Sequence, residues 1–173
     1  FMNVKANMLI AQLEEVESLH IMPTASDESL SIGAALYRYY EKTNNTNYHV
    51  SHIRNLYLGG EFSAERERSD IEKLRKNGNF IVDEPQNMES AVGELLSEEK
   101  IIATCWGRME WGARALGNRS ILAAANDFRR VDQINQMIKM RDFWMPFAPA
   151  IMEEHASKYY DNPKNVTDDF MSV

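Results

Sequence analysis

The residues best suited to chemistry lie between Gly107 and Ser120, where three arginines are spaced among three glycines. The arginines are Arg108, Arg114 and Arg119. A guanidinium group offers a planar fork of N–H donors that matches phosphate or carboxylate oxygens. Glycine lets a ligand approach the main chain because it has no Cβ. The spacing therefore predicts an anion site, and we expect the ligand to carry phosphate.

A simpler interpretation is open for each arginine taken singly, because an exposed arginine can pair with a neighbouring carboxylate such as Glu110. The three together favour the anion site, since like charges held in one loop repel one another unless a negative group lies between them.

Lys139 and Arg141 form a second candidate pair, at the end of a predicted helix. In extended backbone their side chains would project to the same side and converge on one anion, whereas in a continuous helix they would diverge. The alternative is that they only compensate the helix macrodipole, and both interpretations stay open. We expect the aromatic residues that follow to lie in the core and not to stack on a base; they are Phe143, Trp144 and Phe147.

Three further residue types carry weaker signals. Asp27 stands at a candidate helix start, where an N-cap is the simplest role. Cys105 falls within a predicted buried strand and is expected to be an inert core thiol. His49 and His52 lie three apart in a polar stretch, without a convincing zinc-ligand pattern.

The elements that must position these residues follow from hydrophobic periodicity and turn signals. An amphipathic helix is predicted over 5–19, a short strand over 20–22, and a second helix after Ser26 or Asp27. A polar stretch over 42–51 predicts a linker, with a domain boundary near residues 43–55. Further on, helices are predicted over 69–77, 88–97 and 130–139, and strands over 79–83, 101–106 and 120–125.

Composition narrows the function classes. The net charge of −7 argues against a nucleic-acid-coating surface. The segment from Lys100 to Asp142 holds eight Lys or Arg against four Asp or Glu, which suits a small anionic substrate. One cysteine excludes an internal disulfide, no apolar run approaches membrane-spanning length, and no secretory leader is visible. We therefore expect a cytoplasmic protein that does not enter the membrane.

Several blocks resemble the carbamoyltransferase family that includes nodulation and antibiotic O-carbamoyltransferases. They occur in the family's order: Phe1 to Asn7, Ser26 to Ala35, Leu56-Tyr57-Leu58-Gly59, the arginine run with Ile121-Leu122-Ala123, and Ile134-Asn135 through Lys139-Met140-Arg141 to Pro149. Two substitutions depart from the family pattern: Met145 stands where many relatives have arginine, and Ala124 to Asp127 replaces a more usual Asp-Pro-Arg.

The resemblance implies an α/β protein with two modules. Residues 1–50 would be the tail of an actin-like module that binds metal and transfers the carbamoyl group. Residues 51–173 would belong to a YrdC-like α/β module that makes carbamoyl-adenylate from carbamoyl phosphate and ATP. Both ends of the chain fall inside family motifs, so we expect a fragment of a longer enzyme that is inactive for full turnover alone.

The resemblance also implies roles for individual residues. Lys139 and Arg141 match a Lys-x-Arg element that holds the activated group and phosphates, and Asp27 matches a metal ligand. The block expected to bind carbamoyl phosphate and nucleotide contains Arg108, Arg114, Asn118, Arg119 and Ser120.

The implied partners are carbamoyl phosphate, ATP with Mg²⁺, and a small hydroxylated acceptor, with an Fe²⁺-type metal in the actin-like module. Two other functions stay open: a non-catalytic interaction module that has kept the fold, and an RNA-binding YrdC-like module.

Overall fold

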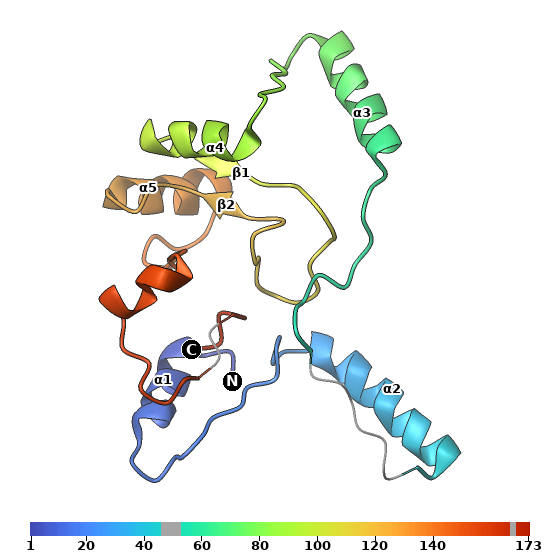
Figure 1. Cartoon of the computed structure of the whole chain (residues 1–173), viewed down its shortest axis with the longest axis vertical. Helices are drawn as coiled ribbons and strands as arrows, with labels where there is room; N and C mark the ends of the chain where they lie inside the picture. Colours follow the sequence, from blue (N-terminus) through green and yellow to red (C-terminus); the bar gives the residue numbers. More distant parts are fainter. Residues whose placement is uncertain (46–52, 167–168) are drawn as a thin grey trace. The chain divides into compact units, whose positions relative to one another are not determined.

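The computed structural model describes residues 1–45, 53–166 and 169–173 (Figure 1). Contacts divide the chain into two compact units. The first unit comprises residues 1–58, 110–116 and 150–173, and the second comprises residues 59–109 and 117–149. The predicted histidine pair, His49 and His52, lies outside the described residues.

In the first unit, helix α1 spans Val4–Gln12 and is shorter than the predicted 5–19. Asn3 caps its start by accepting a hydrogen bond from the amide of Ala6 at 3.0 Å. The helix ends because Leu13 turns to an extended conformation, and the ammonium of Lys164 donates to the carbonyl oxygens of Leu13 and Val16. This contact joins residues about 150 positions apart, so helical periodicity could not reveal it. The strand predicted over 20–22 is absent.

Helix α2 spans Glu28–Thr43 and confirms the helix expected after Ser26 or Asp27. Asp27 occupies the N-cap position, but its side chain makes no capping hydrogen bond. The helix ends at Asn44, which adopts the left-handed conformation that favours a helix stop. A 3₁₀ helix, η2, spans Glu153–Lys158 near the end of the chain.

In the second unit, helix α3 spans Ala64–Asn77. Ser63 caps its start, and Gly78 at φ +71° ends it, as the sequence predicts. The start lies five residues before the predicted Ser69. The strand predicted over 79–83 does not form.

Helix α4 spans Met88–Ser97, as predicted, and Asn87 accepts a capping hydrogen bond from Ser90 at 2.8 Å. Strands β1, Ile102–Ala103, and β2, Ile121–Leu122, form an antiparallel pair, and α4 contacts β1. Both strands are shorter than predicted. Helix α5 spans Phe128–Gln133 and continues as a π-helix, η1, over Ile134–Ile138.

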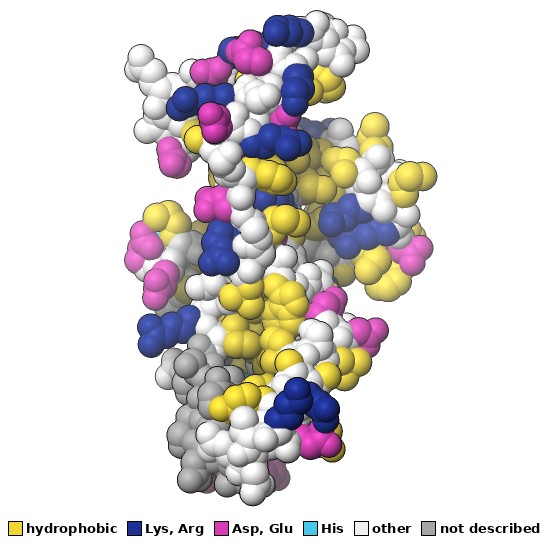
Figure 2. All heavy atoms as spheres, turned by 90° about the vertical axis from the view of Figure 1, so that its right-hand side faces the viewer, with side chains coloured by type: hydrophobic (Ala, Val, Ile, Leu, Met, Phe, Trp, Pro, Cys, Tyr) yellow, Lys and Arg dark blue, Asp and Glu magenta, His cyan; other side chains and the backbone are white. Residues whose placement is uncertain are grey.

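The described residues therefore form a helix-rich mixture of α and β structure. Their buried apolar side chains are Ile21, Leu56, Ile134 and Val166. Figure 2 shows many apolar side chains in the open, between charged groups. The actin-like and YrdC-like assignments and the boundary at residue 50 stay predictions. No helix among the described residues has the length and apolar character needed to cross a membrane.

Candidate functional site

The arginine run contributes to both units. Arg108 and Arg119 belong to the second unit, and Arg114 belongs to the first. Within the second unit, the run follows β1 and returns to β2, so the short strand pair holds both ends of that part of the chain.

Hydrogen bonds made by Thr104 join these two ends of the loop. Its side chain is 7% exposed, and its amide donates to the carbonyl oxygen of Ser120 at 2.8 Å. The Thr104 hydroxyl donates to the carbonyl oxygen of Gly117 at 2.6 Å and accepts from the amide of Ser120 at 2.9 Å. The Ser120 hydroxyl accepts from the amide of Gly117 at 2.9 Å. Ser120, a predicted ligand-binding residue, thus takes part in closing the loop.

Arg119 directs its donors at the main chain of the same loop. Nη1 donates to the carbonyl oxygens of Trp106 at 2.6 Å and Asn118 at 2.8 Å, and Nη2 donates to that of Gly107 at 3.3 Å. The Asn118 side chain donates to the carbonyl oxygen of Arg108 at 2.8 Å. Carbonyl groups carry no net charge, so the guanidinium keeps its positive field while several of its donors hold the loop.

Arg108 is attached to a separate segment of the second unit. Its Nε donates to the carbonyl oxygen of Gly59 at 3.0 Å. The amide of Met109 donates to Gly60 and the amide of Gly59 donates to Met109, both at 2.9 Å. A Cβ on Gly59 would lie 2.6 Å from the Met109 Cβ, so this pairing needs glycine.

In the first unit, Arg114 is exposed, and its Nη2 donates to the carbonyl oxygen of Met2 at 3.3 Å. Beside it, Gly112 at φ +118° packs against Thr24, where an added Cβ would lie 2.7 Å from the threonine hydroxyl. A pocket in this unit has Arg114 in its wall together with apolar side chains such as Ile21 and Leu56.

Glu110, the expected carboxylate neighbour of the arginines, accepts a hydrogen bond from the main-chain amide of Leu116 at 2.7 Å. This bond spans the part of the run that belongs to the first unit. The carboxylate therefore helps to fold the loop.

Lys139 and Arg141 lie in a helix-terminating turn. The extended backbone that would align them is absent: Lys139 is at φ −91° and ψ −13°, and Met140 is left-handed at φ +47°. The amide of Arg141 donates to the carbonyl oxygen of Asn135 at 2.9 Å, and this bond between residues six positions apart closes the helix end. Lys139 is exposed, and its ammonium has no hydrogen-bond or ion-pair partner within the part of the chain that the structure describes. Of the two backbone arrangements considered for Lys139 and Arg141, extended strand and helix end, the structure shows the helix end.

Arg141 is anchored on three sides. Its Nε donates to the Asn135 side-chain oxygen at 2.7 Å, and its Nη2 lies 3.5 Å from the carbonyl oxygen of Pro146. The guanidinium carbon stands 4.6 Å from the centre of the Phe147 ring, a cation–π contact. These contacts hold the guanidinium beside the exposed lysine turn.

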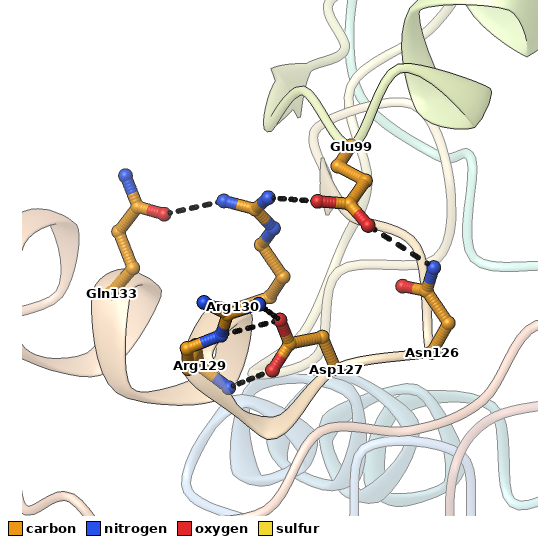
Figure 3. A network of polar contacts seen from close by, with 6 residues as sticks. All are labelled: Glu99, Asn126, Asp127, Arg129, Arg130 and Gln133. Carbon is orange, nitrogen blue, oxygen red and sulfur yellow. Dashed lines mark hydrogen bonds and ion pairs between the residues drawn. The ribbon is translucent and has the colours of Figure 1, made fainter.

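A polar network supports the helix that ends in this turn (Figure 3). Arg130 forms an ion pair with Glu99 at 2.6 Å and donates to Gln133 at 3.1 Å, which links α5 to a residue two positions after the end of α4. Asp127 caps α5 by accepting from the amide of Arg129 at 2.9 Å. The side-chain hydrogen bond from Arg129 lowers the pKa of Asp127, and its backbone amide lowers it further.

Two expectations about burial are wrong. Phe143 and Trp144 are 66% and 65% exposed and so do not form a core, while Phe147 is half-buried against Arg141. Cys105 is exposed, because the strand that was expected to bury it ends at Ala103.

Asp27 is exposed. Among the described residues no group of three or more His, Cys, Asp or Glu could hold a metal ion.

These features define a mixed α/β module with two arginine-bearing loops and a basic helix end. Comparison with known proteins then confirms the family resemblance. Residues 93–173 match the family model described as the carbamoyltransferase C-terminus. This range includes Arg108, Arg114, Arg119, Lys139 and Arg141.

Three relatives illustrate the similarity. An uncharacterized protein of Methanocaldococcus jannaschii is 33% identical over 94% of this chain and 30% of its own length. Nodulation protein NolO of Bradyrhizobium diazoefficiens is 29% identical over 85% of this chain and 26% of its own length. The 3'-hydroxymethylcephem-O-carbamoyltransferase of Streptomyces clavuligerus is 29% identical over 92% of this chain and 28% of its own length. The chain thus spans less than a third of these relatives.

Sequence reasoning missed two residues that organise the site. The sequence places Thr104 in the predicted strand over 101–106 and Asn135 in a block that resembles the family, and neither residue is assigned a role of its own. A usable signal existed for Asn135, because an asparagine within an apolar helical face requires buried hydrogen-bond partners.

Proposed function

We propose that this chain serves O-carbamoyl transfer by contributing to the binding of ATP and carbamoyl phosphate. In this proposal carbamoyl-adenylate forms from these two compounds, and its carbamoyl group passes to a hydroxyl of a small-molecule acceptor. The family match over residues 93–173 and the similarity to a named O-carbamoyltransferase support carbamoyl transfer in general.

The observation that carries the proposal is the turn at Lys139 and Arg141. An exposed ammonium without a partner among the described residues stands two positions from a guanidinium held by Asn135 and Phe147. A cation that is already fixed in position loses little conformational freedom when an anion binds. A phosphate group could take hydrogen bonds from both side chains, and Arg108 and Arg119 would add positive field from the same unit.

The chemistry asked of these residues is electrostatic. Carbamoyl phosphate is first hydrolysed to carbamate and phosphate. A carbamate oxygen then attacks the α-phosphorus of ATP, the bond to the β-phosphate oxygen breaks, and pyrophosphate leaves. Finally the acceptor hydroxyl oxygen attacks the carbamoyl carbon, the bond from that carbon to the AMP phosphate oxygen breaks, and the hydroxyl proton passes to solvent as AMP leaves. Lys139 and Arg141 would stabilise charge on the phosphate oxygens and hold the reactants close together.

The finer assignments belong to the same proposal. Residues 1–50 would be the tail of an actin-like module and residues 51–173 part of a YrdC-like module. ATP would arrive with Mg²⁺ on its phosphates, and Asp27 would be one ligand of an Fe²⁺-type metal completed by groups outside the described residues.

The test is calorimetric titration of the folded chain with ATP and Mg²⁺, and separately with carbamoyl phosphate. We expect Lys139→Ala to weaken ATP binding about 10-fold, the loss of one charge-assisted contact. Lys42→Ala is the matched control, because Lys42 is also an exposed lysine in the last turn of a helix. Arg114→Ala tests whether Arg114 of the first unit also contributes to the binding of ATP.

Equal affinities for Lys139→Ala and wild type would contradict the proposed role of the turn, as would absence of binding by a folded wild-type chain. Salt-sensitive binding of RNA without binding of ATP would instead support a nucleic-acid module.

A further inference from the structure

Asn135 is the most completely buried polar side chain of the second unit, at 0% exposure. It lies in the π-helix η1 beside Ile134, the other buried residue of that helix. A buried amide without partners would be strongly unfavourable. Its presence there therefore calls for a full set of hydrogen bonds.

The structure supplies that set. The Asn135 side-chain nitrogen donates to the carbonyl oxygens of Phe143 and Met145, both at 3.0 Å. The side-chain oxygen accepts from Arg141 Nε at 2.7 Å, and the main-chain oxygen accepts from the Arg141 amide at 2.9 Å. One residue thus holds both the main chain and the side chain of Arg141, together with the segment that follows it.

The contacts also decide which part of the guanidinium stays open. Nε donates a hydrogen bond to the Asn135 side-chain oxygen, and the guanidinium carbon lies over the Phe147 ring. Nη2 has a single long contact to Pro146 at 3.5 Å, and Nη1 has no partner within the described part of the chain. The two terminal nitrogens, which form one edge of the guanidinium, are therefore the ones left for a ligand.

We infer that Asn135 is a positioning residue that orients Arg141 so that its two terminal nitrogens face a phosphate or carboxylate ligand. The ligand role of Arg141 rests on the proposed function, but the orientation does not. Asparagine suits this task because its amide combines an acceptor with two N–H donors. Aspartate would keep the acceptor for Nε but would face two carbonyl oxygens without a proton to donate.

The direct test observes the Arg141 Nε–H group by nitrogen-15 NMR of the full 173-residue chain, with Arg141→Lys used to assign the signal. We expect this proton to exchange with solvent at least 10-fold more slowly than that of Arg68, an exposed arginine of α3 whose side chain has no hydrogen-bond partner among the described residues. In Asn135→Ala the protection should be lost. In Asn135→Asp it should persist although the chain is less stable. Gln136→Ala, an exposed neighbour, is the matched control and should change nothing.

An Arg141 signal that exchanges as fast as that of Arg68 in the wild-type chain would overturn the inference, whether or not any Asn135 variant folds. Protection that survives in a folded Asn135→Ala chain would also overturn it, since a purely structural asparagine would change stability without changing this proton.

Titration with ATP and Mg²⁺ then separates the inference from the proposed function. If both hold, Asn135→Ala and Arg141→Lys should each weaken ATP binding about 10-fold, and the double variant should be little weaker than either single variant, because both remove the same oriented group. If the wild-type chain binds no ATP while the NMR result stands, the proposed function fails and the positioning role remains. Fully additive losses in binding would contradict the positioning role.

Discussion

Arg119 and Lys139 both carry a positive charge in the second unit, yet their donors are used differently. The Arg119 guanidinium is half-buried and donates to three carbonyl oxygens of its own loop, those of Trp106, Asn118 and Gly107. The Lys139 ammonium is exposed at a helix end and has no partner among the described residues. A dense run of arginines in a sequence therefore does not by itself identify the cations that are open to a ligand.

We infer that the arginine run and the turn at Lys139 and Arg141 have different roles. Arg119, the glycines of the run and Thr104, which precedes it, hold the arginine run in shape, and the run contributes positive field. The turn at Lys139 and Arg141 presents cations whose donors are available. Substitutions in the run should therefore alter stability first, and substitutions in the turn should alter binding first.

The largest expected effect is that of Gly112→Ala in the run. The new Cβ would lie 2.7 Å from the Thr24 hydroxyl, and φ is +118°. We expect a loss of about 3 kcal/mol in the free energy of unfolding, from backbone strain and overpacking together. Gly117→Ala is the matched control, because φ is +115° but nothing lies within 4 Å of the added Cβ. Chemical denaturation measures both, and equal losses would contradict the close packing at Thr24.

A smaller loss should follow Thr104→Val, which keeps the shape of the side chain but removes its hydroxyl. The amide of Ser120 would lose its partner at a partly buried position, which costs about 2 kcal/mol. Thr104→Ser should retain most of the stability. Thermal unfolding of the two variants compares them, and a valine variant as stable as the serine variant would show that Thr104 does not fasten the loop.

Arg119→Lys should cost about 1 kcal/mol of stability, because a lysine keeps the charge but cannot bridge three carbonyl oxygens. Arg114→Lys should be close to neutral, because Arg114 is exposed and its carbonyl contact is at 3.3 Å. Urea denaturation of both variants tests the comparison. The reverse order of effects would mean that Arg114, not Arg119, holds its surroundings.

In the turn, Met140→Gly should stabilise the chain by about 0.5–1 kcal/mol. Met140 is left-handed at φ +47° and 87% exposed, so glycine would relieve backbone strain and lose little packing. Differential scanning calorimetry should show a higher melting temperature. Met137→Gly, also exposed but inside the helix, is the control that should lower it.

The smallest effect concerns the cap of the helix that leads to the turn. Hydrogen bonds from Arg129 lower the pKa of Asp127 below its ordinary value of 3.8. Because the lowered pKa belongs to the folded chain, this contribution to stability is complete above the ordinary value and is lost as pH falls through the lowered one. NMR titration of the carboxyl group should give a pKa below 3.8. In Arg129→Ala the pKa should return towards that value, and an unchanged pKa would show that Arg129 is not the cause.

Local signals predicted some elements well. Helix α4 begins and ends where the sequence indicates, because Asn87 caps it and its apolar spacing is regular. Gly78 ends α3 for a reason that is also local, since glycine tolerates positive φ. Helix α1 is shorter than its periodicity predicts, and Lys164 donates to the carbonyl oxygens of Leu13 and Val16 just beyond its end. No pattern within residues 5–19 contains that information.

In the candidate site, too, local sequence patterns do not contain the contacts that decide the geometry. Spacing identified Lys139 and Arg141 as a pair but left open whether they align in extended backbone or end a helix. The left-handed Met140 and the bonds to Asn135 decide this, and they depend on how the segment from Phe143 to Met145 folds back. Cys105 was expected in a buried strand, but the strand pair is only two residues long on each side.

The sequence by itself determined the carbamoyltransferase resemblance, the bounds of α4, the end of α3, and the positions of the basic residues, because these depend on residue identity and on neighbours within about four positions. Only the tertiary structure decided which of those cations hold main-chain carbonyls and which are left open, and that Asn135 lies buried beneath Arg141. Hydrogen-bond donors are assigned by whatever acceptors the folded chain brings within about 3 Å, and that proximity is a property of the three-dimensional path.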